Sequence, residues 1–199
     1  MGGIKLDKFF ALNEDKQATI INAALQCFGK FGYGKASIND IAVAAGISKA
    51  SVFQYFGSKK GLYKHLITYA GKIIMESFQK DDFHEKTDLF DRILSSSFTE
   101  ARTLEMNPYV SQFIASAWSE TADEVNGILT EFKRETSKFR NNLILRQDDV
   151  SKFKNPDDAG TVLQILMLMA EGYAARCRNA GDAAYVSWAD EFQKIIESM

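Results

Sequence analysis

The 199-residue sequence is poor in proline, cysteine and histidine, with only two of each. Few prolines and few strand-like runs favour helices throughout, so we predict an all-α chain. Cys27 and Cys177 lie far apart in helical patterns, which is typical of a reduced cytoplasmic compartment. No apolar run approaches the ~18–20 residues of a membrane span, and the N-terminus lacks the apolar region of a signal peptide. We therefore expect no membrane partner.

Signals of catalysis are also scarce. His65 and His84 are the only histidines, and both are expected among solvated residues. The sequence has no HExxH motif, no paired cysteines and no glycine-rich phosphate loop, and the serines at 95–97 have no nearby base. We therefore predict no catalytic residue, metal or cofactor, and we keep a small all-helical enzyme only as a distant alternative.

Charge is distributed unevenly along the chain. Residues 1–65 contain nine lysines and four acidic residues, whereas the remainder contains 15 basic and 22 acidic ones. The formal net charge of -2 by itself argues against a nucleic-acid partner. A basic end on an acidic body nevertheless suits a protein that places one end on phosphates. Chance clustering of lysines on a solvated surface is the alternative.

The stretch 37–56 has the pattern of two short helices joined by a tight turn. Ser37 and Ser48 stand where N-cap residues are expected, and Gly46 stands where the turn needs a positive φ. Val52 and Phe56 would face inward from the second helix. On or beside its exposed side we expect Lys49, Ala50, Ser51, Phe53, Gln54 and Tyr55. This arrangement is typical of a helix-turn-helix that fills a DNA major groove.

Helices are also predicted on both sides of this motif. Residues 1–12 are expected to form a frayed arm, and a first helix to run from the N-cap Asn13 to Gly32. The apolar stripe of that helix would consist of Ile20, Ala24, Cys27, Phe28 and Phe31. Ser58 is predicted as the N-cap of a further helix that continues to about Phe78.

Lys59 and Lys60 would occupy the first two positions of the helix that follows the motif. Cations are unfavourable at a helix N-terminus, and the sequence shows no compensating partner. Beside a helix-turn-helix, this lysine pair and the first backbone N–H groups are suited to hold a DNA phosphate. Two solvated lysines without partners are the alternative.

The rest of the chain is predicted to contain five more helices. They are expected over residues 81–105, 107–118, 121–146, 155–181 and 185–196, which gives about nine helices in all. The fourth of these is apolar around most of its circumference, as in a helix that is buried on all sides. We therefore predict that the last two helices form a four-helix bundle with a second copy of the chain. A fully internal core helix is the alternative.

Residues 32–62 extend the motif into the helices around it, in a specific combination of residues. It consists of Gly32-Tyr33, Ser37-Ile38, Ile41-Ala42, Ala45-Gly46-Ile47-Ser48, Ala50, Val52-Phe53, Tyr55-Phe56, Ser58-Lys59 and Leu62. This combination resembles the TetR family of one-component transcriptional regulators. The resemblance implies dimeric repressors with an N-terminal three-helix DNA-binding domain, here 1–58, and a C-terminal ligand-binding and dimerisation domain, here 59–199.

The resemblance also implies which residues contact DNA. They are Ser48, Lys49, Ala50, Ser51, Phe53, Gln54 and Tyr55 for base edges and phosphates, with Ser37 and Lys59 for further phosphates. The family often has tyrosine at position 53, so Phe53 is expected to pack and Tyr55 to provide the hydroxyl. Gln54 is suited to adenine and Lys49 to guanine. Because this helix has no arginine, we expect specificity to rest on few base contacts and on DNA shape.

The ligand and dimer contacts are less well defined by the sequence. A ligand pocket is predicted among Phe98, Met106, Tyr109, Phe113, Trp118, Phe132, Met167 and Glu171, with a plain apolar core as the alternative. Glu171 would meet a cationic ligand, or pair with Arg102, Arg176 or a residue of the second copy. The dimer interface is predicted at Leu166, Tyr173, Trp188, Phe192 and Ile195.

Together these features predict a homodimeric repressor that binds a palindromic DNA operator and is released by a small-molecule effector. A DNA-binding protein of the same fold that responds to no ligand is the alternative.

Overall fold

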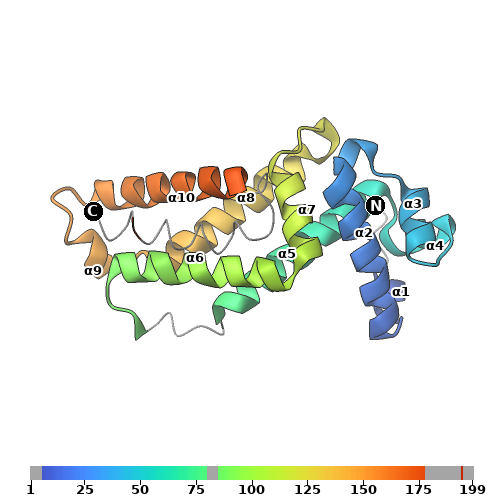
Figure 1. Cartoon of the computed structure of the whole chain (residues 1–199), viewed down its shortest axis with the longest axis horizontal. Helices are drawn as coiled ribbons and strands as arrows, with labels where there is room; N and C mark the ends of the chain where they lie inside the picture. Colours follow the sequence, from blue (N-terminus) through green and yellow to red (C-terminus); the bar gives the residue numbers. More distant parts are fainter. Residues whose placement is uncertain (1–5, 80–84, 178–193, 195–199) are drawn as a thin grey trace. The chain divides into compact units, whose positions relative to one another are not determined.

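The computed structural model describes residues 6–79, 85–177 and 194. These residues form helices and no strands, which confirms the predicted all-α class (Figure 1). The ten helices are α1 (Asp7–Phe10), α2 (Glu14–Lys35), α3 (Ile38–Ala44), α4 (Lys49–Phe56), α5 (Lys59–Gln79), α6 (Leu89–Met106), α7 (Pro108–Trp118), α8 (Asp123–Ile144), α9 (Gln147–Val150) and α10 (Asp157–Cys177). None of these helices has the length and apolar character needed to cross a membrane.

The chain divides into two compact units. The first unit is Met1–Lys72 with Asn107–Lys133, and the second unit is Ile73–Met106 with Arg134–Met199. Helices α5 and α8 therefore contribute residues to both units. These units are defined by packing. The predicted boundary between a DNA-binding domain, 1–58, and a ligand-binding domain, 59–199, stays a prediction.

Short-range caps define several helix starts, as the sequence predicts. The Asn13 side chain accepts a hydrogen bond from the Lys16 N–H at 2.9 Å, at the start of α2. The Ser58 hydroxyl accepts from the Gly61 N–H at 2.9 Å, at the start of α5. Each cap satisfies a backbone donor that has no partner within its own helix.

The expected N-terminal arm is instead a short helix, α1, over Asp7–Phe10. Phe9 is 1% exposed, and its ring centroid lies 5.0 Å from that of Phe56 and 5.4 Å from that of His65. The arm prediction is therefore wrong for these residues, because burial of Phe9 holds the segment against α4 and α5. The expectation of a solvated His65 is wrong for the same reason.

An aromatic core holds α2, α5 and α7 together in the first unit. It contains Phe28, Tyr33, Tyr63 and Phe113, whose ring centroids lie 5.1–6.5 Å apart in edge-on and stacked pairs. Such pairs add a specific geometry to the burial of apolar area. Phe31, which the sequence places on the inner stripe of α2, is 47% exposed and lies outside this core.

Glu120 joins the connection between α7 and α8 to the end of α2. One carboxylate oxygen accepts a hydrogen bond from the Tyr33 N–H at 2.5 Å, and the other accepts from the Thr121 and Ala122 N–H groups at 3.0 Å. Tyr33 directly follows a kink in α2 at Gly32, whose φ of 70 is not helical. The carboxylate therefore supplies acceptors to backbone donors at two separate helix ends.

The second unit has a core formed by α6, α8 and α10. Its buried residues are Leu89, Ile93, Ala101, Ile144, Leu163 and Leu166. Near this core the Phe78 and Phe139 rings lie 5.9 Å apart, and Arg140 pairs with Glu100 at 3.1 Å. The ring contact connects the end of α5 to the second half of α8, and the ion pair connects α6 to the same part of α8.

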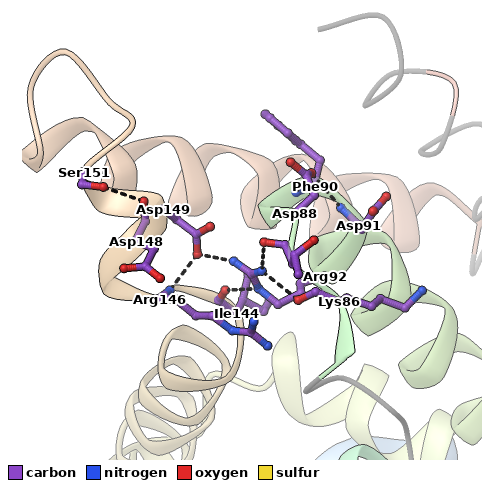
Figure 2. Close-up of polar contacts among 11 residues, drawn as sticks. Lys86, Asp88, Phe90, Asp91, Arg92, Ile144, Arg146, Asp148, Asp149 and Ser151 are labelled. Carbon is purple, nitrogen blue, oxygen red and sulfur yellow. Dashed lines mark hydrogen bonds and ion pairs between the residues drawn. The ribbon is translucent and has the colours of Figure 1, made fainter.

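A buried ion pair in the second unit joins α6 to α9 (Figure 2). Arg92 is fully buried and donates to the carboxylate of Asp149, which is 2% exposed. Arg92 also donates to the backbone carbonyls of Ile144 at 2.8 Å, Lys86 at 3.1 Å and Thr87 at 2.7 Å. Buried charges are tolerated when they are paired and hydrogen-bonded in this way.

The same pair determines the pKa of Asp149. Burial acts to raise this pKa, but the hydrogen bonds from Arg92 and from the Arg146 N–H favour the carboxylate more strongly. The net effect is a pKa below the ordinary value for aspartate, so the group is ionised at neutral pH.

Candidate nucleic-acid interface

Helices α3 and α4 form the predicted helix-turn-helix (Figure 1). The Ser37 hydroxyl accepts from the Asp40 N–H at 3.4 Å, and the Ser48 hydroxyl accepts from the Ser51 N–H at 3.0 Å. Between the helices Gly46 has a φ of 61, a conformation that a residue with a Cβ adopts only at a cost. The caps and the turn residue therefore stand where the sequence predicts them.

Lys16 of α2 stabilises this turn from outside the motif. Its ammonium donates to the carbonyls of Ala45 at 3.0 Å and Gly46 at 3.3 Å, at the C-terminal end of α3. A cation at a helix C-terminus is favourable because it satisfies unpaired carbonyls and complements the helix dipole. Sequence reasoning missed this contact, which joins residues 29 and 30 positions apart.

The outward side of α4 is formed by four exposed residues, Lys49, Ala50, Phe53 and Gln54, which we call the recognition face. Their spacing of one, three and four residues places them side by side on one surface of the helix. The opposite side of α4 contributes Val52 and Phe56, both fully buried. Burial of one side thus orients the other side outward.

Phe53 and Tyr55 lie in different surroundings, and the predicted hydroxyl contact of Tyr55 stays a prediction. The packing expected of Phe53 is incomplete, because its side chain is 40% exposed on the recognition face. Tyr55 is half-buried, with its ring centroid 6.2 Å from those of Phe9 and Phe56. The reason is helical phase, because residue 55 follows the buried Val52 by three positions and points toward α1.

Lys59 has partners that the sequence does not reveal. Its ammonium donates to the Gly34 carbonyl at 3.3 Å and lies 4.7 Å from the centroid of the Tyr33 ring. The carbonyl and the aromatic face compensate for the unfavourable position of the cation at the start of α5. Lys60, its neighbour, is exposed. The phosphate contacts of both lysines, and that of the half-buried Ser37, stay predictions.

A close backbone approach fixes the corner between α4 and α5. A Cβ added to Gly61 would lie 2.0 Å from the carbonyl oxygen of Phe56, a distance that no side chain movement relieves. Only glycine fits at this position, so the last residue of α4 can rest directly on the first turn of α5.

The comparison with protein families agrees with this geometry. Residues 20–66 match the family model described as bacterial regulatory proteins, tetR family. Over these residues the chain is similar to the TetR family. The matched residues include most of α2, both helices of the motif and the first turns of α5.

Curated relatives match parts of the chain. A 68-residue segment, 32% of this chain, is 34% identical to IcaR of Staphylococcus aureus, an HTH-type negative transcriptional regulator of the biofilm operon, and spans 37% of it. A 48-residue segment, 24% of this chain, is 42% identical to the HTH-type transcriptional regulator RutR of Escherichia coli and spans 23% of it. The chain thus spans less than two fifths of the length of these relatives.

Solved structures of transcriptional regulators, one of them described as TetR family, share the fold over most of the chain. A regulator from Chloroflexus aurantiacus is 20% identical, with a TM-score of 0.71 over 96% of this chain and 94% of that one. FadR of Bacillus subtilis, solved in complex with stearoyl-CoA, is 14% identical, with a TM-score of 0.70 over 90% and 96%. At these identities the likeness shows a shared fold.

The residues predicted for the ligand pocket lie in both units. Phe98 and Met106 belong to α6 in the second unit and are 39% and 72% exposed. In the first unit, Phe113 is fully buried in the aromatic core and Tyr109 is 42% exposed. Trp118 lies under the Lys133 ammonium, 5.0 Å from the ring centroid, and Phe132 lies against Gly71. The side chains of Met167 and Glu171 lie outside the described residues, and a shared pocket stays a prediction.

Most residues predicted for the dimer interface also lie outside the described part of the chain. These are Trp188, Phe192 and Ile195, together with the side chain of Tyr173. Leu166 is described, and it is 1% exposed within the core of the second unit of its own chain. The dimer interface therefore stays a prediction.

Proposed function

We propose that the chain is a homodimeric one-component repressor that binds a near-palindromic operator and is released from it by a small-molecule effector. The observation that carries the proposal is the recognition face, which presents one cationic, one amide and two apolar side chains on a capped helix. Its size and polarity suit a DNA major groove, which admits one α-helix.

The names of relatives and neighbours support the regulatory part of the proposal. IcaR is described as a negative transcriptional regulator, and FadR of Bacillus subtilis was solved in complex with stearoyl-CoA. By analogy we propose that this chain represses transcription and responds to a small molecule. Its operator and its ligand are its own and are not inferred from these two proteins.

The mechanism we propose is a shift between two conformers of the dimer. In the DNA-binding conformer the two recognition faces enter successive major grooves, about 34–36 Å apart. An effector that binds the other conformer more tightly shifts the population, by no more than its difference in affinity for the two. Helix α5 is the proposed connection, because it begins beside the motif and contributes residues to both units.

Binding to DNA from upstream of the chain's own gene tests this proposal. We expect Lys49→Ala and Tyr55→Phe to weaken binding in a gel-shift titration, while Lys154→Ala, an exposed lysine of the second unit, leaves it unchanged. Unchanged binding by both motif variants would refute the assigned surface. Sedimentation of the same samples tests the dimer, which has twice the 22.3 kDa mass of the chain.

The alternative is a DNA-binding protein of the same fold that responds to no ligand. A thermal-shift screen of small molecules separates the two ideas. The repressor proposal expects at least one compound that both stabilises the protein and releases it from DNA, since such a compound binds one conformer preferentially. If every stabilising compound leaves the DNA complex intact, the alternative holds.

A further inference from the structure

The recognition face contains an apolar pair between two hydrogen-bonding residues. Ala50 and Phe53 are exposed and stand three positions apart, so their side chains are neighbours on the surface of α4. Lys49 and Gln54 lie on either side of this pair. Half of the recognition face therefore has no group that donates or accepts a hydrogen bond.

Among the described residues, other side chains than Phe53 anchor α4. Val52 and Phe56 already supply the buried side of α4, and both are fully buried. The helix start is fixed by the Ser48 cap, and its end rests on Gly61 of α5. An exposed phenyl ring on an otherwise anchored helix is therefore available to a partner.

The major groove offers one apolar group to such a ring. Guanine, adenine and cytosine present only hydrogen-bond donors and acceptors at their major-groove edges, whereas thymine also presents its 5-methyl group. We propose that Phe53, with the small Ala50 beside it, contacts a thymine 5-methyl group in each half of the operator. This inference rests on the proposed function and adds to it the base that the apolar pair reads.

The neighbouring residues agree with this assignment. Ala50 leaves room for the ring of Phe53 to approach the groove, since its own side chain is a single methyl group. Lys49 and Gln54 remain suited to guanine and adenine on the flanking base pairs. A phenyl ring lacks the hydroxyl that a phosphate contact needs, so a base methyl group is the contact that suits its chemistry.

Replacement of thymine by deoxyuridine removes this methyl group and nothing else. The preferred duplex is first selected from a pool of random 30-base-pair DNA, and binding is then measured by fluorescence anisotropy. Each thymine is replaced in both half-sites at once. We expect at least one symmetric position where the replacement weakens binding about threefold to fivefold per methyl group, the ratio expected when one methyl group is no longer buried.

Variants of Phe53 assign the effect to its side chain. Phe53→Ala is expected to bind the thymine and deoxyuridine duplexes equally well at that position, and Phe53→Leu to keep part of the difference. Phe31→Ala serves as the matched control, because Phe31 is also exposed but lies on α2. This control is expected to behave like the unmodified protein.

Two results would overturn the inference. One is a preferred duplex in which no thymine replacement changes the affinity. The other is a deoxyuridine effect that Phe53→Ala retains in full at every sensitive position. Either result leaves the proposed function intact, whereas a failure to enrich any sequence refutes that function and this inference together.

Discussion

Arg92 is a charged residue whose side chain has no exposed surface. An unpaired charge there would be strongly destabilising, but four of its N–H donors meet acceptors: three carbonyls and the Asp149 carboxylate. Because the acceptors come from the residues before α6, the end of α8 and α9, the side chain holds three segments together (Figure 2). Such a pair is costly to break on one side.

We predict that Arg92→Met lowers the free energy of unfolding by about 3–5 kcal/mol, because it leaves the Asp149 carboxylate buried without its cation. Arg134→Met is the control, since Arg134 and Glu135 form an exposed pair that contributes about 1 kcal/mol or less. Urea unfolding followed by circular dichroism measures both. The double variant Arg92→Met with Asp149→Leu is expected to be destabilised by less than the sum of the single changes.

His65 gives the first unit a dependence on pH. Burial among the rings of Phe9, Phe10 and Phe56 lowers the pKa of His65 below its ordinary 6.5. Between the lowered pKa and about 6.5 the unfolded chain therefore binds a proton that the folded chain does not. Stability contributed by the neutral imidazole is complete above 6.5 and decreases as the pH falls below that value.

We predict that His65→Leu, which removes the titrating group, makes the protein less sensitive to acid in this range. The melting temperature of the unmodified protein should decrease more between pH 7.5 and pH 5.5 than that of the variant. Differential scanning fluorimetry at several pH values checks this difference. Equal decreases in the two proteins would contradict the assignment of this dependence to His65.

At the scale of helices, the sequence predicts those helix starts that are determined by residues close together in the chain. Asn13, Ser37, Ser48 and Ser58 each cap the helix that was expected after them, because a cap acts on a donor two or three residues away. Helix α1 was missed because nothing local requires it: burial of Phe9 against α4 and α5 stabilises it. Local signals thus predict the capped helices, whereas packing between distant residues decides α1.

Contacts between distant residues were beyond sequence reasoning. Arg92 and Asp149 are 57 positions apart, and Tyr33 and Glu120 are 87 positions apart. Charged residues at such separations show no periodicity or spacing that links them. Which side of α4 is exposed was predictable because residues within one helix determine it, whereas the partners of Lys16 and Lys59 depend on tertiary packing.

The link between Glu120 and the end of α2 has a measurable consequence. We predict that Glu120→Gln lowers the free energy of unfolding by about 1–2 kcal/mol, because hydrogen bonds to a charged acceptor are stronger than those to a neutral one. Exchange of the Tyr33 amide hydrogen should become about tenfold faster. Glu105→Gln, an exposed residue of α6, should change neither quantity. A Tyr33 exchange rate that does not respond would show that Glu120 does not protect this amide.

At the scale of the whole molecule, charge distribution separates binding to phosphates from recognition of bases. The lysines of residues 1–65 are concentrated in the part of the chain that carries the recognition face. Each phosphate contact releases counterions from DNA and so makes the affinity depend on salt, whereas an uncharged contact to a base does not. The two kinds of contact can therefore be told apart without a structure of the complex.

We predict that Lys60→Ala reduces the slope of log affinity against log salt concentration by about one unit for each phosphate contact that the substitution removes. Gln54→Ala should weaken binding at every salt concentration while leaving the slope unchanged, because the amide carries no charge. Anisotropy titrations between 50 and 200 mM salt, roughly the range where such slopes are resolved, provide the measurement. An unchanged slope for Lys60→Ala would remove Lys60 from the phosphate-contacting residues.

The separation of the two sides of α4 also bears on how a protein of this kind diverges. Val52 and Phe56 hold the helix in place, while the four residues of the recognition face are exposed and contribute little to stability. Exposed substitutions usually change stability by about 0.5 kcal/mol or less. Under the proposed function, changes at these four positions after a gene duplication would therefore alter which promoters a copy controls without first weakening its fold. For the same reason, the four positions of the recognition face are the ones to randomise when engineering regulators that do not bind one another's operators.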